Sequence, residues 1–254
     1  MKTQSLFLIV LIMLLAAGCR GGGPERKAVT ETETITVPDT GYTGIKQYMS
    51  GNRIVREVTF KNGVREGLTQ TFYPGGQVYQ TFWYENGMRE DSGRYYYLEG
   101  QLFRTTPYKN DTIDGIQKQY YRTGKLKAKI GYNKGFRTPF LEEYSSAGKL
   151  MKDYPEIVVT VNDQYATKGL YTINLELSDK STKVKFNRGE FINNRFDTTY
   201  IKPINTVNGK ARIDLKKTGT PGEKYLGVIG EILTPFGNRH LAYKRIELPY
   251  NDLK

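Results

Sequence analysis

The sequence predicts an all-β protein, a single-layer sheet of β-hairpin repeats followed by a small β-sandwich. Three observations lead to this class. Aromatic, glycine and aliphatic residues recur every 24 positions from about residue 45 to 155, short strand-like stretches separated by turn residues fill 156–254, and neither region has a helical period of useful length. We therefore divide the chain into residues 1–18, 19–44, 45–155 and 156–254.

Residues 1–18 have the form of an export signal. Lys2 is followed by twelve apolar residues, Leu6 to Ala17, a run shorter than the roughly 17–25 residues of a membrane-spanning helix. Small residues then lead into Cys19, the only cysteine of the chain. This arrangement resembles the lipobox of bacterial lipoproteins, which implies cleavage before Cys19, acylation of its thiol, and a lipid anchor in the cell envelope, with the outer membrane favoured. The alternative is an ordinary signal peptide with an unrelated cysteine.

Residues 20–44 read as a flexible tether. They begin with Arg20, three glycines and Pro24, and contain no aromatic residue before Tyr42. Such a composition cannot bury a core of its own. The alternation of Thr and Glu between Val29 and Val37 permits the alternative that this stretch is a strand held by the folded part.

The repeat is visible as five columns of residues in one register. The columns are Gly76, Gly100, Gly124 and Gly148; Tyr48, Phe72, Tyr96, Tyr120 and Tyr144; Phe60, Tyr84, Tyr108 and Tyr132; Gly63, Gly87, Asp111 and Gly135; and Ile54, Val78, Leu102, Leu126 and Leu150. Because each hairpin alone is marginally stable, we expect the units to stack into one continuous sheet.

Each unit has the signature of a β-hairpin. Asn62-Gly63 and Asn86-Gly87 supply the positive φ angles of a tight turn. Alternation then predicts an aromatic face, with Phe82 and Tyr84, and a more polar face with Thr81. Pro107 lacks a ladder donor, which favours an edge or a bulge.

These residues resemble the bacterial variant of the MORN repeat. The resemblance is carried by Tyr-Pro-Gly-Gly-Gln at 73–77, Lys-Asn-Gly-Val-Arg-Glu-Gly at 61–67 and Tyr-Tyr-Arg-Thr-Gly-Lys-Leu at 120–126. It covers about residues 45–155, with departures at Asp91 and Ser145. The resemblance extends to YwqK-type proteins and so implies an antitoxin role.

The second half predicts six further strands. They are Ile157–Val161, Leu170–Leu177, Thr182–Phe186, Ala211–Leu215, Leu226–Leu233 and Leu241–Leu248. Short strands at this spacing favour a sandwich of the immunoglobulin or fibronectin type, with a Greek-key barrel as the alternative. We interpret Gly219-Thr220-Pro221-Gly222 as a hairpin turn.

The composition argues against an enzyme, a metal site or a cofactor. His240 is the only histidine, so the usual zinc and nucleophile–histidine sites lack partners. Glu142 and Glu143 are adjacent, as are Glu90 and Asp91, and neighbours on a strand point to opposite faces. We therefore expect these carboxylates to be solvated charges at the rim.

The excess positive charge is distributed over both predicted domains. The chain carries a formal net charge of +12, with 18 basic and 11 acidic groups in 45–155 and 16 and 11 in 156–254. One local cluster contains Arg122, Lys125, Lys127 and Lys129. It is either a solvated face that blunts edge pairing or a contact with anionic lipid head groups or acidic glycans. Nucleic acid is not expected, because the protein is exported.

The sequence therefore favours a lipid-anchored envelope protein that acts as a non-catalytic binding scaffold for a protein or polysaccharide. The alternatives are an antitoxin or immunity protein, and a module that binds an anionic membrane surface.

Overall fold

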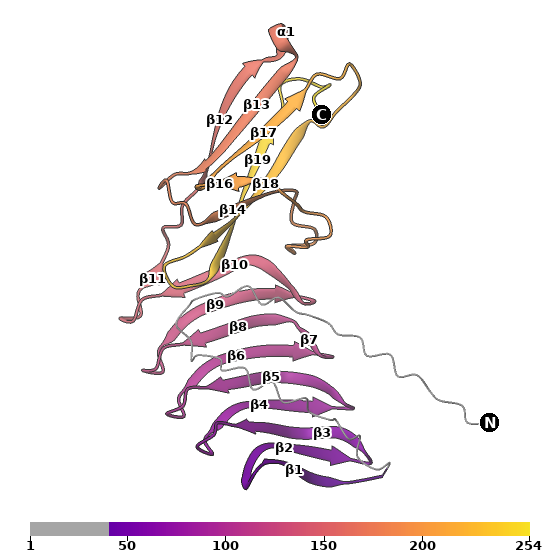
Figure 1. The fold of residues 1–254 in the computed structure, drawn as a ribbon, viewed down its shortest axis with the longest axis vertical. Coiled ribbons are helices and arrows are strands. Elements are labelled where there is room, and N and C mark those ends of the chain that lie inside the picture. Colours follow the sequence, from indigo (N-terminus) through magenta and orange to yellow (C-terminus); the bar gives the residue numbers. More distant parts are fainter. Residues whose placement is uncertain (1–40) are drawn as a thin grey trace, which may run out of the picture. The chain divides into compact units, whose positions relative to one another are not determined.

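The structure, a computed structural model, describes residues 41–254. Cys19, the predicted signal peptide and most of the predicted tether lie outside this range, as does the alternative strand from Val29 to Val37. The described residues form strands and one four-residue helix, α1 (Tyr165–Lys168). They comprise a repeat sheet and a sandwich (Figure 1).

The repeat sheet is a single antiparallel meander of eleven strands (Figure 1). Its strands are β1 (Gly44–Ser50), β2 (Arg53–Lys61), β3 (Val64–Phe72), β4 (Val78–Glu85), β5 (Met88–Tyr96), β6 (Leu102–Lys109), β7 (Thr112–Ile113), β8 (Gly115–Tyr120), β9 (Leu126–Asn133), β10 (Phe136–Tyr144) and β11 (Leu150–Met151). Each neighbour in the sequence is a neighbour in the sheet, except that the short β7 pairs only with β6. This arrangement confirms the predicted sheet of stacked hairpins.

The predicted turns have the backbone that their residues favour. Asn62, Asn86 and Asn110 have φ angles of 52°, 49° and 48°, and each is followed by another residue of positive φ. Pro107 lies in β6, where it pairs with Ser92 on one side only. The break between β7 and β8 lies on its other side, so the missing N–H donor falls at the predicted irregularity.

A tyrosine directly after the aromatic column of Phe72, Tyr96 and Tyr120 connects each unit to the next. The hydroxyl groups of Tyr73, Tyr97 and Tyr121 donate to main-chain carbonyls 23 residues further on, at 2.8, 2.9 and 2.7 Å. The same tyrosines hold their own turns, since the carbonyl of Tyr97 accepts the N–H of Gly100. Ser145 has no phenol to continue this series, so the ladder of hydroxyl bonds ends at the fifth unit.

We expect Tyr97→Phe to lower the free energy of unfolding by about 1 kcal/mol, because the carbonyl of Tyr120 loses a part-buried donor. Urea denaturation measures the change. Tyr120→Phe is the matched control, since Tyr120 contributes its main-chain carbonyl to this bond. Equal losses in the two variants would contradict the role of the hydroxyl.

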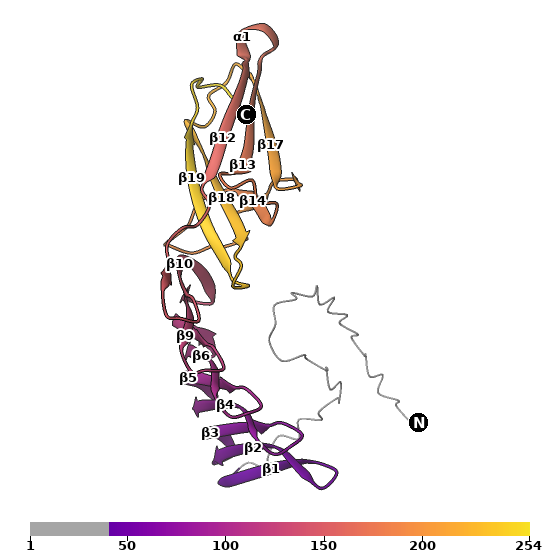
Figure 2. The same ribbon diagram turned by 90° about the vertical axis from the view of Figure 1, so that its left-hand side faces the viewer.

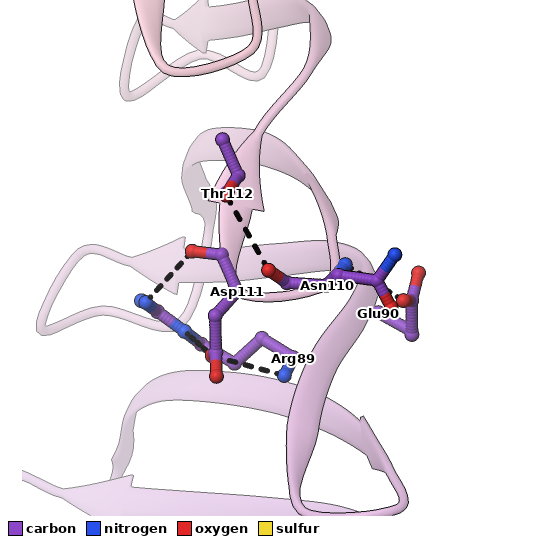
Figure 3. A network of polar contacts seen from close by, with 5 residues as sticks. All are labelled: Arg89, Glu90, Asn110, Asp111 and Thr112. Carbon is purple, nitrogen blue, oxygen red and sulfur yellow. Dashed lines mark hydrogen bonds and ion pairs between the residues drawn. The ribbon is translucent and has the colours of Figure 1, made fainter.

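At the other ends of the strands, where the Asn-Gly turns lie, carboxylates connect each unit to the next. Glu66 accepts the main-chain N–H of Asn86 at 2.8 Å, and Glu90 accepts that of Asn110 at 2.7 Å. In the third unit Arg89 adds an ion pair of 2.8 Å with Asp111, which stands in the glycine column (Figure 3). This ion pair and the hydrogen bonds of Asp111 hold the pKa of that carboxyl below its usual range. The predicted rim charge Glu90 therefore has a structural partner.

One face of the repeat sheet is the aromatic face predicted by alternation. Phe60, Tyr84 and Tyr108 are buried in it. Arginine guanidinium groups cover two of these rings, at 5.5 Å for Arg65 over Tyr84 and 4.4 Å for Arg89 over Tyr108. Much of this face is thus occupied by side chains of the chain itself.

The sandwich consists of two four-stranded sheets (Figure 2). The first has the order β12 (Ile157–Gln164), β13 (Leu170–Leu177), β17 (Lys210–Lys216), β16 (Thr206–Val207); the second has the order β15 (Lys202–Pro203), β14 (Val184–Arg188), β18 (Tyr225–Leu233), β19 (Arg239–Glu247). In chain order these correspond to the ABED and C′CFG sheets of an immunoglobulin-like domain. All six predicted strands are present. They lie in two separate sheets, so the alternative of a Greek-key barrel is wrong.

The sandwich core is drawn from both sheets. Phe186 and Leu226 from one sheet and Ile173 and Leu175 from the other are at most 1% exposed. The predicted hairpin at 219–222 is wrong, because β17 and β18 belong to different sheets. The segment instead crosses between the sheets beside the C-terminus. A Cβ atom on Gly222 would lie 2.2 Å from the carbonyl oxygen of Leu253, which explains why glycine is needed there.

Candidate surface for an extended ligand

The second face of the repeat sheet is the candidate site, and we call it the open face. It is defined by a row of residues directly paired from strand to strand: Gln47, Glu57, Gln70, Thr81, Arg94, Thr105, Lys118, Lys129 and Glu142. Residues paired in this way point to the same side of a sheet. Thr81 belongs to this more polar face as predicted, but it is only 7% exposed.

The predicted basic cluster is only partly available to a ligand. Lys129 forms an ion pair of 2.9 Å with Glu142, and Arg122 is paired with Glu99. The bond to Glu142 raises the pKa of Lys129. Lys127 has its ammonium 6.0 Å from the ring of Tyr121, and Lys125 is exposed in the turn before β9. The four residues thus lie near one another in the fourth unit, but two of their charges are locally compensated.

Two further cations extend this cluster along the open face. Arg94 lies opposite Thr105, which lies opposite Lys118, which lies opposite Lys129. Both Arg94 and Lys118 are exposed. Sequence reasoning missed them because neither lies in a run of basic residues. They share a row only through the pairing of β5, β6, β8 and β9.

We call the paired row that defines the open face the charged row. Beside it lies a second row, of exposed apolar side chains. Leu68, Trp83, Ile116 and Phe140 are 41, 45, 41 and 39% exposed. Leu68 and Trp83 are directly paired, and each lies two residues from a member of the charged row, as do the other two. The signal that would have found them is the same period, since residues 68, 116 and 140 fall in one 24-residue column.

A buried polar cluster connects β10 with the turn between β18 and β19. Glu143 is fully buried and accepts hydrogen bonds from Thr234 and Asn238, both at 2.7 Å, and from Tyr154 at 3.2 Å. The expectation of a solvated rim charge is therefore wrong for Glu143. The sequence could not reveal this, because the donors come from two distant segments, one at Tyr154 and the other the turn that contains Thr234 and Asn238. Glu142 lies on the other face and is half-buried beside Lys129.

The single histidine is part of the same junction. His240 is half-buried in β19 and stacks on Tyr154, with ring centroids 4.2 Å apart. Burial lowers its pKa, and the nearby charge of Arg137 lowers it further. Arg137 donates to the carbonyl of Arg239 at 2.9 Å. His240 therefore packs at this junction as a half-buried residue of β19.

A second candidate is a cavity of about 610 Å³ in the sandwich. Arg188, Tyr200, Lys202, Glu223 and Tyr225 are among the residues that line it. Arg188 is held by Glu223 at 2.8 Å, so its charge is compensated. None of the described residues that line it is a histidine.

Within residues 41–254, no three His, Cys, Asp or Glu side chains are grouped as a metal site would require. No helix of this part of the chain is long and apolar enough to cross a membrane.

The family model described as the MORN repeat variant matches residues 113–134. This segment comprises the end of β7 and all of β8 and β9, so it contains the Lys118 and Lys129 pair of the open face. The chain thus contains a MORN-type repeat within an all-β fold. Comparison with curated proteins and with solved structures found no match.

Proposed function

We propose that this protein is a lipid-anchored component of the bacterial cell envelope, and that its repeat sheet is a non-catalytic scaffold. The partner is an extended protein or polysaccharide that lies along the open face. The observation that carries this proposal is the row of apolar side chains exposed in register on that face.

Exposed apolar groups at fixed intervals favour a binding role. A large apolar side chain in water costs free energy that is recovered when a partner covers it. Trp83 is the largest of these groups, and tryptophan is enriched among the residues that dominate binding energies. Two strands per unit separate equivalent positions by about 10 Å, which suits a ligand that is itself extended.

The two faces of the sheet differ in a way that supports this assignment. On the aromatic face, arginines already cover Tyr84 and Tyr108. On the open face, Trp83 donates its indole N–H to Glu85 at 3.3 Å and leaves its ring exposed. A partner therefore gains more contact on the open face. The carboxylates Glu142 and Glu143 lie on opposite faces, which argues for binding rather than for paired acid–base chemistry.

We expect the full chain, immobilised and exposed to the protein and polysaccharide fractions of envelope extracts, to retain a ligand that Trp83→Ala loses. The cost of removing the indole is about 2 kcal/mol or more if it is a central contact, equivalent to at least a tenfold loss of affinity. Tyr243→Ala is the control, because Tyr243 is also exposed but lies in the sandwich. Equal retention by wild type and Trp83→Ala, or no retention by either, would contradict the scaffold proposal.

A further inference from the structure

The centre of the open face contains two cations, Arg94 and Lys118, that the fold does not neutralise. Lys118 and Lys129 are directly opposite each other on β8 and β9, an arrangement that destabilises a sheet. Lys129 is compensated by Glu142. Within residues 41–254, neither Lys118 nor Arg94 has an ion-pair partner. The row therefore presents two free cations separated by Thr105 on one intervening strand.

The positive part of the row is bounded by carboxylates. Glu57 lies toward the β1 end and Glu142 at the β10 end of the same row. Between them the positive charge spans the four strands from Arg94 to Lys129, and Lys127 lies two residues from Lys129 on the same face of β9. A linear anion can follow these cations without meeting Glu57 or Glu142. The carboxylates beside Trp83, Glu85 and Glu90, already accept the Trp83 indole N–H and the Asn110 main-chain N–H.

The exposed apolar side chains beside these cations provide a second kind of contact for a ligand. Trp83 lies two residues from Thr81, the partner of Arg94, and Ile116 lies two residues from Lys118. Residues two apart on one strand are about 6–7 Å apart along it, and a bulge in the β4–β5 pairing lies between the Thr81–Arg94 and Trp83–Glu90 pairs. An aromatic ring and an aliphatic side chain next to cations form a surface on which the C–H faces of sugar rings pack while their acidic groups bind the cations.

We propose that the open face binds a linear polysaccharide that carries carboxylate groups. The glycan lies across strands β4 to β9, its carboxylates bind Arg94 and Lys118, and its rings pack on Trp83 and Ile116. This inference rests on the proposed scaffold function and names the chemical class of its ligand. A planar anionic membrane fits less well, because it would meet Glu57 and Glu142 together with the cations.

The test compares the binding of the full chain to polygalacturonate and to the same polymer with its carboxyl groups methyl-esterified. We expect the ester to bind at least about tenfold more weakly, since it loses charge-assisted hydrogen bonds. Arg94→Glu with Lys118→Glu should weaken binding of the acidic polymer by at least about tenfold. Lys61→Glu with Lys185→Glu, two exposed lysines away from the row, should change it by less than about twofold. Raising the salt concentration should weaken the wild-type interaction.

A second variant, Arg94→Gln with Lys118→Gln, separates loss of charge from misfolding and should show the same direction of change. Equal binding of acid and ester, or an unaffected Arg94 and Lys118 variant, would overturn the inference. Binding to phosphatidylglycerol vesicles that depends on these two residues, without binding to polygalacturonate, would assign the face to a membrane instead. If the acidic polymer does not bind but Trp83→Ala fails to retain another envelope ligand, the scaffold proposal stands and only the polysaccharide inference is overturned. If no ligand depends on Trp83, both proposals are overturned.

Discussion

Cys19→Ser is expected to abolish lipid labelling and to release the protein from membranes. Serine lacks the thiol that would be acylated, and the buried acyl chains supply about 0.8 kcal/mol per methylene group to membrane binding. Metabolic labelling with radioactive palmitate, followed by fractionation of cells into soluble and membrane parts, measures both effects. This is the largest change that we expect from any single substitution.

The control for this experiment is Arg20→Ala, which alters the neighbouring residue and leaves the cysteine in place. It should remain labelled and membrane-bound. Unlabelled wild-type protein, or labelling that persists in Cys19→Ser, would contradict the lipoprotein interpretation and favour an ordinary signal peptide.

Glu143→Ala is expected to lower the free energy of unfolding by about 3 kcal/mol. The substitution removes the acceptor of three hydrogen bonds and leaves the donors of Thr234 and Asn238 buried without it. Each unsatisfied buried donor costs about 1–3 kcal/mol, offset in part because a buried carboxylate is itself costly. Thermal or urea denaturation of the full chain measures the loss.

Glu142→Ala is the matched control, because the adjacent carboxylate has a single, partly exposed ion pair with Lys129 and a hydrogen bond from Tyr144. Exposed pairs contribute about 0–1 kcal/mol. The loss of unfolding free energy in Glu143→Gln should lie between those of Glu142→Ala and Glu143→Ala, since the amide keeps one acceptor oxygen. Equal effects of Glu142→Ala and Glu143→Ala would show that the buried cluster does not stabilise the junction.

Much of the fold was predictable because its determinants are local and repeated. Asn62-Gly63 and its equivalents favour positive φ angles whatever the remainder of the chain does. The aromatic column of Phe60, Tyr84 and Tyr108 marks one face of each hairpin by alternation alone. The six principal strands of the sandwich are likewise apolar stretches bounded by turn residues. The hairpin at 219–222 was wrong because a turn sequence does not specify whether its flanking strands share a sheet.

The candidate site was predictable only in part. The cluster at Arg122 to Lys129 was found because its residues are close in sequence. The compensation of Lys129 by Glu142 depends on the register between β9 and β10. The row from Arg94 to Lys118 depends on two further registers, and bulges shift the pairing within several of these strands. Such shifts decide which side chains become neighbours and leave the hydrophobic pattern unchanged.

The sequence by itself determined the all-β class, the 24-residue period and the turn positions of the repeats, because each is set by residues near one another in the chain. Only the tertiary structure decided that Glu143 is buried, that Arg94, Lys118 and Lys129 share one row, and that Trp83 lies exposed beside it. These features arise from contacts between strands, and a side chain's burial and charge partners are properties of those contacts.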